Sequence, residues 1–252
     1  MRLITHSDWL VREEDLLATV DERTRVLAIS QVSFYTGQNI NIPELAAGLA
    51  GTDTLLAVDA THAAGAVQVH AAEADLCVSS SYKWLLATHG VAPCYVSDRA
   101  EALLRPTTFG WRNLAVWPAQ GAERAPDAEE KPMPERLEPG NPSMVSVLYL
   151  DYALERLLQI GIERIEAHNR DLSEQVSAGL EGLQQKVISP KVRERRSGNT
   201  CFAADDAHVL CEALADREVL VWGEYGRVRV SGHLYNNSAD VERFLSVLQE
   251  LI

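Results

Sequence analysis

The stretch LLAVDATHAAGAVQVHAAEADLCVSSSYKWLLATHG, residues 55–90, decides the fold of this chain. It contains two short apolar runs, residues 55–58 and 76–78, and each run ends abruptly at polar residues. Short continuous apolar runs are typical of buried parallel strands. Open α/β sheets bind their ligands just beyond the carboxyl ends of such strands. The stretch therefore predicts a parallel sheet with a ligand site at one edge.

Polar side chains follow both runs. Asp59 ends the first run and His62 comes three residues later, while three serines, Tyr82 and Lys83 follow the second. Ser30 ends an earlier predicted strand and would face the same crevice. Pyridoxal phosphate (PLP) chemistry uses a lysine for a Schiff base, a carboxylate for the pyridine nitrogen and donors for the phosphate. This edge of the sheet therefore predicts a PLP site.

Each of these residues also has an ordinary structural explanation. A lysine after a strand is usually a solvated surface residue, and Asp59 alone is explained as a helix cap. Lys83, however, is followed by the apolar residues 84–86. A lysine in an apolar segment must lose its charge, pair it or react. We therefore favour a reactive role for Lys83.

The composition disfavours several classes of function. The net charge of −13 disfavours binding to nucleic acids and to anionic membranes. The four cysteines form no CxxC pair, which indicates reduced thiols, and we assign no metal site. The first ten residues do not have the pattern of a signal peptide, and the apolar runs are short for a membrane span. We expect a soluble, cytoplasmic protein without nucleic-acid or membrane partners.

The remaining pattern alternates between helices and strands. Helices are expected at 8–21, 43–50, 98–104, 206–216 and 238–251, with two consecutive helices over 143–182 that are separated at Gly161. Strands are expected at 25–30, 55–58, 76–78, 91–96, 200–204, 219–222 and 227–231. Residues 105–141 form a long loop, with 118–135 exposed. The elements predict an α/β fold with a mostly parallel sheet flanked by helices and a small C-terminal α/β domain.

Six motifs occur in order along the chain: SQVSFYTGQNINIPEL (30–45), VDATHAAGAVQV (58–69), SSSYKWLLATHG (79–90), FGW (109–111), PGNPS (139–143) and RVRVSGHLYNNSADVERF (227–244). Together they resemble the class V (fold type I) PLP-dependent aminotransferase superfamily. Within it the likeness is closest to kynureninase, which hydrolyses the side chain of 3-substituted alanines. The resemblance implies a partial large PLP-binding domain at 1–142. Residues 143–252 would be the connecting helices and the small C-terminal domain.

The resemblance also implies roles for the residues at the sheet edge. Lys83 would form the Schiff base with PLP, and Asp59 would pair with its pyridine nitrogen. His62 and Ser30 would contact the cofactor, and Tyr82 would hydrogen-bond its phosphate. These five residues are the implied cofactor site, with Lys83 and Asp59 as the catalytic pair.

Three further positions follow from the same resemblance. Trp111 and Asn141 match positions that form the cofactor and substrate pocket across a subunit interface. Arg229 matches the arginine that binds the substrate α-carboxylate, a task that suits the bidentate guanidinium fork. On its own, Arg229 would be an ordinary surface arginine beside a strand. Since enzymes of this class are typically dimers, we expect a homodimer or a partner chain, and a small amino-acid substrate.

The sequence also departs from the family pattern. Full-length members have a long N-terminal portion, before the segment that matches residues 8–21, which supplies a phosphate-binding turn and an aromatic residue against the cofactor ring. We expect either that a separate polypeptide supplies these parts or that the chain is a truncated product. Residues 217–228 contain no cysteine, which disfavours a cysteine desulfurase. The prediction is a kynureninase-like C–C hydrolase; the alternatives are a class V aminotransferase or lyase of other specificity, or a non-catalytic subunit.

Overall fold

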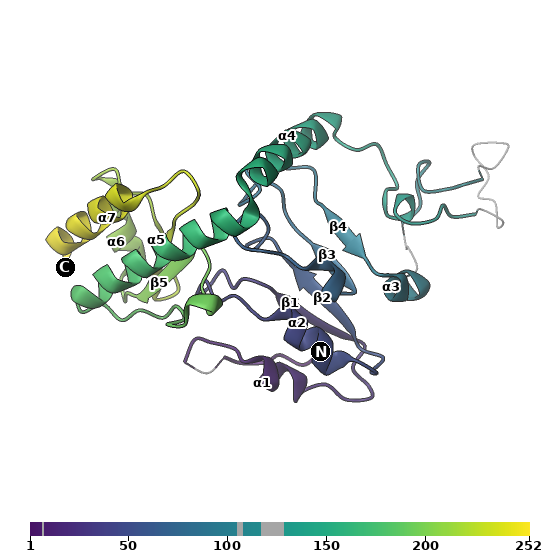
Figure 1. Cartoon of the computed structure of the whole chain (residues 1–252), viewed down its shortest axis with the longest axis horizontal. Coiled ribbons are helices and arrows are strands. Elements are labelled where there is room, and N and C mark those ends of the chain that lie inside the picture. Colours follow the sequence, from purple (N-terminus) through teal and green to yellow (C-terminus); the bar gives the residue numbers. More distant parts are fainter. Residues whose placement is uncertain (7, 105–107, 117–128) are drawn as a thin grey trace.

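The computed structural model describes all residues except 7, 105–107 and 117–128. Its larger sheet has four strands in the order β1-β2-β3-β4 (Figure 1). They are β1 (Val26–Ser30), β2 (Leu55–Asp59), β3 (Leu76–Val78) and β4 (Cys94–Val96). The first three are parallel, and β4 pairs antiparallel with β3 at the edge. The mostly parallel sheet is confirmed.

Three helices accompany the large sheet: α1 (Glu13–Leu17), α2 (Ile42–Leu49) and α3 (Asp98–Leu103). Asn41 caps the start of helix α2, because its side chain accepts a hydrogen bond from the backbone N–H of Glu44. The first turn of the helix contains a proline. Both features are typical of a helix start. Leu45 of α2 and Leu56 of β2 are buried in one apolar cluster. This cluster holds α2 against the sheet.

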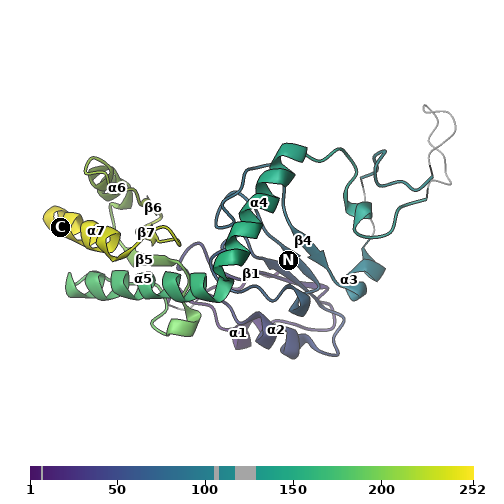
Figure 2. The same ribbon diagram turned by 45° about the horizontal axis from the view of Figure 1, so that its top comes forward.

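Two long helices connect the large sheet to the rest of the chain. They are α4 (Met144–Ile160) and α5 (Ile162–Gly182), and they meet at Gly161, whose φ is 94°. Glycine adopts a positive φ at a lower conformational energy than other residues. The chain therefore changes direction at Gly161, as the sequence predicts. Figures 1 and 2 both show α4 beside the large sheet and α5 running along the small one.

The small sheet has the strand order β5-β7-β6 and is antiparallel. Its elements are β5 (Asn199–Ala203), α6 (Ala207–Ala215), β6 (Trp222–Glu224), β7 (Arg227–Ser231) and α7 (Ser238–Leu251). Phe202, Val228 and Phe244 belong to the apolar cluster on the helix-covered face. Because side chains alternate along a strand, Arg227 and Arg229 lie on the opposite face, toward the large sheet. The small C-terminal α/β unit is confirmed. The domain boundary at 142/143 stays a prediction.

Three expected elements differ from the structure, one of them the strand expected at 91–96, which is confined to Cys94–Val96. The helix over 8–21 is confined to Glu13–Leu17, because Asp8 and Trp9 have φ values of 49° and 70°, outside the right-handed helical region. The strand expected at 219–222 begins at Trp222, where pairing with Arg229 starts. Three short 3₁₀ helices also occur, at Ala71–Glu73, Glu135–Leu137 and Arg193–Arg195. Most of the segment predicted to be exposed, residues 118–135, lies outside the described residues.

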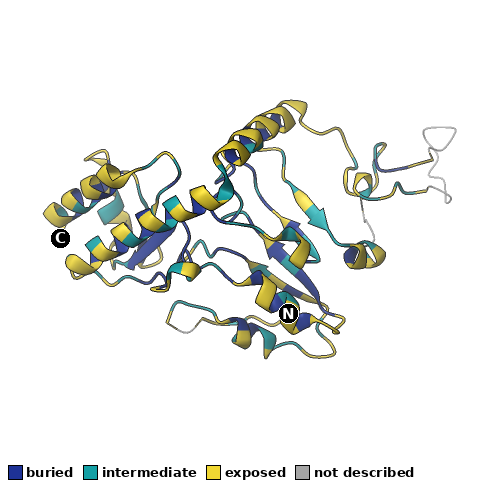
Figure 3. Ribbon diagram, in the orientation of Figure 1, coloured by how far each residue is buried: buried dark blue, intermediate teal, exposed yellow. Residues whose placement is uncertain are grey.

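Buried residues are frequent in β2 and β5, whereas much of α4 is exposed (Figure 3). The exposed residues of α4 include Leu148 and Tyr152. Among the described residues, no helix combines the length and the apolar character needed to cross a bilayer.

Candidate functional site

The carboxyl ends of β1 and β2 bring the first predicted residues together. Ser30 and Asp59 are register partners at the ends of these parallel strands, and Asp59 also aligns with Val78 at the end of β3. Asp59 Oδ1 accepts a hydrogen bond from the backbone N–H of Thr61 at 2.9 Å. Both Ser30 and Asp59 are exposed. The sheet edge predicted from the sequence therefore exists.

Lys83 and His62 contact each other beside this edge. Lys83 Nζ lies 3.0 Å from His62 Nε2. The segments that carry them approach closely at Gly65, where a Cβ would lie 2.2 Å from the backbone oxygen of Trp84. Gly65 also has a φ of 90°, a conformation in which glycine is favoured. This close packing places the amine against the imidazole.

His62 is held neutral at physiological pH. Its pKa is lowered from 6.5 to about 4: burial is the largest cause, the charges of Lys83 and Arg229 add to it, and the charge of Asp59 opposes it. Its Nδ1 is buried and has no hydrogen-bond partner within the described chain. The imidazole therefore offers a neutral ring with one nitrogen available to a ligand.

A cavity of about 420 Å³ opens between the two sheets at this point. It is lined by Phe34, His62, Lys83, Trp84, Asn199, Trp222, Arg229, Ser231, His233 and Tyr235. Two of these residues, Lys83 and Arg229, are cations, and the described lining contains no aspartate or glutamate. The cavity is therefore suited to an anionic ligand, although the whole chain has a net charge of −13.

Arg229 reaches this cavity from β7. Its guanidinium lies 5.0 Å from the ring of Trp222 and its Nη1 donates to the backbone oxygen of Phe34 at 3.4 Å. Its Nε is buried without a partner among the described residues. Burial lowers the pKa of Arg229, and the neighbouring Arg227 lowers it further. An anion in the cavity would stabilise this charge.

His233 ties the small sheet to the lysine segment. Its Nε2 lies 3.0 Å from the backbone oxygen of Trp84, and its ring stacks on the Trp84 indole at 4.9 Å between centroids. Burial lowers the pKa of His233, so it is neutral and can donate through one ring nitrogen. The segment that carries Lys83 is thereby fixed to the C-terminal part of the chain.

The other predicted residues lie outside the described lining of the cavity. Tyr82 is 44% exposed and stacks on His89 at 3.9 Å between ring centroids. Trp111 and Asn141 are exposed and belong to the segment between α3 and α4, whose described part projects away from both sheets (Figures 1 and 2). The structure thus brings His62, Lys83 and Arg229 together in one cavity and leaves Trp111 and Asn141 apart.

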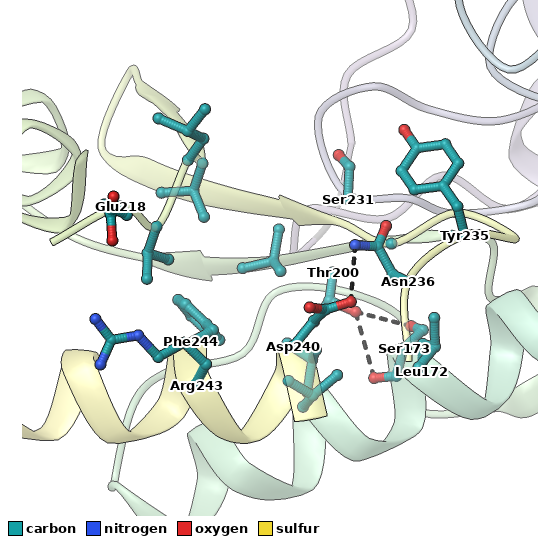
Figure 4. Close-up of a pocket in the computed structure, with 18 residues that line it drawn as sticks. Leu172, Ser173, Thr200, Glu218, Ser231, Tyr235, Asn236, Asp240, Arg243 and Phe244 are labelled. Carbon is teal, nitrogen blue, oxygen red and sulfur yellow. Dashed lines mark hydrogen bonds between the residues drawn. The ribbon is translucent and has the colours of Figure 1, made fainter. Parts of the chain in front are cut away.

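A second cavity, of about 480 Å³, lies on the other face of the small sheet, against α5 and α7 (Figure 4). Its walls mix apolar and polar residues, with Phe244 among the apolar ones. Two pairs of its polar groups bond to each other: Ser173 to Thr200 at 2.8 Å and Asn236 to Asp240 at 3.1 Å. None of the predicted catalytic residues lines its described walls. We therefore place the functional site in the cavity with Lys83.

The model of the family described as "Aminotransferase class-V" matches residues 2–244 of this sequence. The chain belongs to this family. A probable cysteine desulfurase of Pseudomonas putida is 30% identical over 95% of this chain and 62% of its own length. A kynureninase of Monosiga brevicollis is 28% identical over 96% of this chain and 56% of its own length. The class V chain described here thus spans about three fifths of the length of these relatives.

Solved structures show the same fold. The apo cysteine desulfurase from Thermococcus onnurineus NA1 superimposes with a TM-score of 0.89 at 23% identity, covering 100% of this chain and 66% of that chain. A C-DES variant with glycine covalently linked to its PLP cofactor superimposes with a TM-score of 0.83 at 19% identity, covering 94% of this chain and 63% of that chain. These likenesses confirm the predicted fold class.

The relatives do not single out kynureninase. Several of the matched class V proteins are named cysteine desulfurase, and others are named kynureninase. The prediction of the superfamily is confirmed, whereas the closer likeness to kynureninase is not. The broader alternative, a class V enzyme of another specificity, is the better supported one.

Some residues of this cavity are not indicated by the local sequence. Phe34, Asn199 and Trp222 line the cavity, yet they lie on a turn and on the small sheet, far from Lys83 in the sequence. Their position depends on how the two sheets pack, which no local pattern reports. Arg227 was also missed, but the alternation in RVRVS already places it on the face of Arg229.

The residues of the cavity fit a PLP group. They offer a lysine amine, a neutral imidazole with an unpartnered Nδ1, and a carboxylate at the adjoining sheet edge that acts electrostatically on the same imidazole. The lysine and the carboxylate are the groups that PLP chemistry uses for its aldehyde and its pyridine nitrogen.

Proposed function

We propose that this chain carries the lysine-bearing part of a class V, PLP-dependent enzyme that acts on an α-amino acid. The observation that supports it is the contact of 3.0 Å between Lys83 Nζ and His62 Nε2, in a cavity that Arg229 also lines. Lysines in such surroundings condense with carbonyl compounds. A family match over residues 2–244 supports the same chemistry.

Each residue has a task in this proposal. When bound, PLP supplies an aldehyde and an electron-accepting ring. Lys83 holds the aldehyde, and its amine is the group placed to move a proton at the substrate Cα. Asp59 keeps the pyridine nitrogen protonated, and neutral His62 contacts the ring. Arg229 binds the α-carboxylate, which fixes the orientation of the reacting bond.

Four residues outside the cavity complete the proposed site. Ser30 contacts the cofactor from the end of β1, and Tyr82 donates a hydrogen bond to its phosphate. Trp111 and Asn141 lie on the projecting segment and would enter the pocket of a second subunit, in a homodimer or with a partner chain. The 53% exposure of Trp111 is consistent with such a contact.

The reaction type is the open part of the proposal. We propose a class V reaction on an α-amino acid, with kynureninase-like C–C hydrolysis as one specificity and aminotransferase or lyase chemistry as the others. A desulfurase needs a reactive cysteine. Cys201 is the register partner of Arg229, but it is fully buried, and burial raises its pKa to about 12. Cys211 lies in α6 with its Sγ under Gly223. Burial raises the pKa of Cys211, which disfavours the nucleophilic thiolate.

The test is the covalent attachment of PLP to Lys83. The purified chain, mixed with PLP and reduced with borohydride, is expected to carry a pyridoxyl group on Lys83 that peptide mass spectrometry locates. Lys83→Ala should lose this adduct, whereas Lys191→Ala, at an exposed lysine, should keep it. Equal labelling of both variants would overturn the proposal and leave the non-catalytic subunit as the explanation.

A further inference from the structure

Arg227 is a fully buried cation that forms no ion pair within the described part of the chain, although the charge of Glu224 acts on it from a distance. Its relative exposure is 0%, and its Nε and Nη2 have no hydrogen-bond partner among the described residues. Its Nη1 donates a long hydrogen bond of 3.4 Å to the backbone oxygen of Glu224. A guanidinium does not lose its proton in proteins. Arg227 therefore remains charged in the protein interior.

Aromatic rings surround this guanidinium. Tyr35 lies 4.1 Å from Arg227 Cζ, Trp222 4.9 Å, Phe34 5.6 Å and Tyr225 5.8 Å, measured to the ring centroids. Cation–π contacts contribute about 0.5–2 kcal/mol each, but they leave the hydrogen-bonding capacity of the N–H groups unused. A buried charge without hydrogen bonds costs several kcal/mol. The aromatic rings therefore leave N–H groups of Arg227 without acceptors, and an anionic ligand would supply these acceptors.

Arg227 lies next to the cavity of Lys83. Arg227 and Arg229 are two residues apart on β7, so their side chains share the face turned toward the large sheet. Trp222 contacts both guanidiniums, at 4.9 and 5.0 Å, and it lines the cavity together with Phe34. Arg227 itself lies outside the described lining of this cavity. A ligand would reach its N–H groups by displacing the ring of Tyr35, which is 44% exposed.

We infer that Arg227 and Arg229 together select an amino acid that carries two acidic groups. Arg229 binds the α-carboxylate, and Arg227 binds the acid on the side chain behind the wall of Trp222 and Phe34. Residues two apart on a strand are separated by roughly 7 Å. A short diacid with one carboxylate at each guanidinium can bridge such a separation. The inference rests on the proposed function for the role of Arg229, and it adds the substrate class.

The test uses simple acids and the chain without cofactor. Succinate and glutarate are the diacid probes, butyrate is the monoacid probe, and isothermal titration calorimetry gives the Kd of each. We expect the diacids to bind at least about tenfold more tightly than butyrate, which corresponds to about 1.4 kcal/mol. Arg227→Met should reduce this preference to near unity while butyrate binding persists. Arg229→Met should weaken the binding of all three.

Two further variants keep the outcome interpretable. Arg193→Met, at a surface arginine paired with Asp171 and Glu174, should retain the wild-type preference. Arg227→Lys keeps the charge but loses the bidentate geometry of the guanidinium, so we expect an intermediate preference for diacids. This variant replaces Arg227→Met if Arg227→Met does not fold. Equal affinity of the wild-type chain for diacids and butyrate, no diacid binding, or a preference that survives in Arg227→Met would overturn the inference. The labelling of Lys83 is independent of these probes, because they carry no amine and no PLP is present.

Discussion

At the scale of single residues, His62 couples the charges of the site. Lys83 contacts it directly, and Arg229 and Asp59 act on its pKa with opposite signs. Burial has the largest effect and favours the neutral ring. A neutral imidazole can accept or donate one hydrogen bond without adding a third cation to the cavity. This explains how Lys83 and Arg229 are tolerated within one small cavity.

The pKa of His62 predicts a pH dependence of stability. The folded-state pKa is about 4 and the ordinary value is 6.5, so between these values the unfolded chain binds more protons. The free energy of unfolding then falls as the pH drops from 6.5 to about 4 and is unaffected by this group above 6.5. Since the ring is partly solvated, we expect a loss of about 1–2 kcal/mol. Urea unfolding at several pH values measures it.

A non-titrating variant isolates the contribution of this histidine. His62→Gln should have a shallower pH dependence than the wild-type chain between pH 4 and 6.5. The exposed His70 provides the matched control, and His70→Gln should keep the wild-type slope. An identical slope in wild-type protein and His62→Gln would contradict the neutral, buried state of the imidazole.

At the scale of elements, the sequence predicted what local pattern controls. The apolar runs predicted β2 and β3, and the pattern of residues 238–251 predicted α7, which spans Ser238–Leu251. It did not predict the short length of α1, because the backbone of Asp8 and Trp9 depends on contacts that periodicity does not describe. The grouping of Lys83 with His62 followed from strand ends. The positions of Phe34 and Trp222 in the cavity did not follow from it, since these residues meet only when the two sheets pack.

Helix α7 offers a test of local stability. Asn237 caps it in a capping box, in which its side chain accepts from the helix backbone and Asp240 accepts from the backbone of Asn237. Asn237→Ala should lower the free energy of unfolding by about 1 kcal/mol. Asp206 precedes α6 without a side-chain cap bond within the described structure, so Asp206→Ala should change stability by less than about 0.5 kcal/mol. Equal losses in the two variants would exclude the cap as the cause.

At the scale of the whole molecule, helix α4 is apolar on two sides. Leu150 and Leu157 are buried against the rest of the chain. Val145, Leu148 and Tyr152 are 64%, 66% and 59% exposed, and at about 100° per residue they share one stripe on the other side. A helix that is apolar on both sides is normally covered on both. The projecting segment with Trp111 joins the start of this helix.

We therefore predict that the chain self-associates through the exposed stripe of α4. Burying three large apolar side chains stabilises an interface, at roughly 25 cal/mol per Å² of apolar surface removed from water. Light scattering after size-exclusion chromatography should show a dimer, and Leu148→Glu should shift it to a monomer. Leu158 lies on the same helix and is 73% exposed but outside the stripe, so Leu158→Glu should leave the dimer intact. A wild-type chain that stays monomeric at high concentration, or equal effects of the two variants, would rule out α4 as the interface.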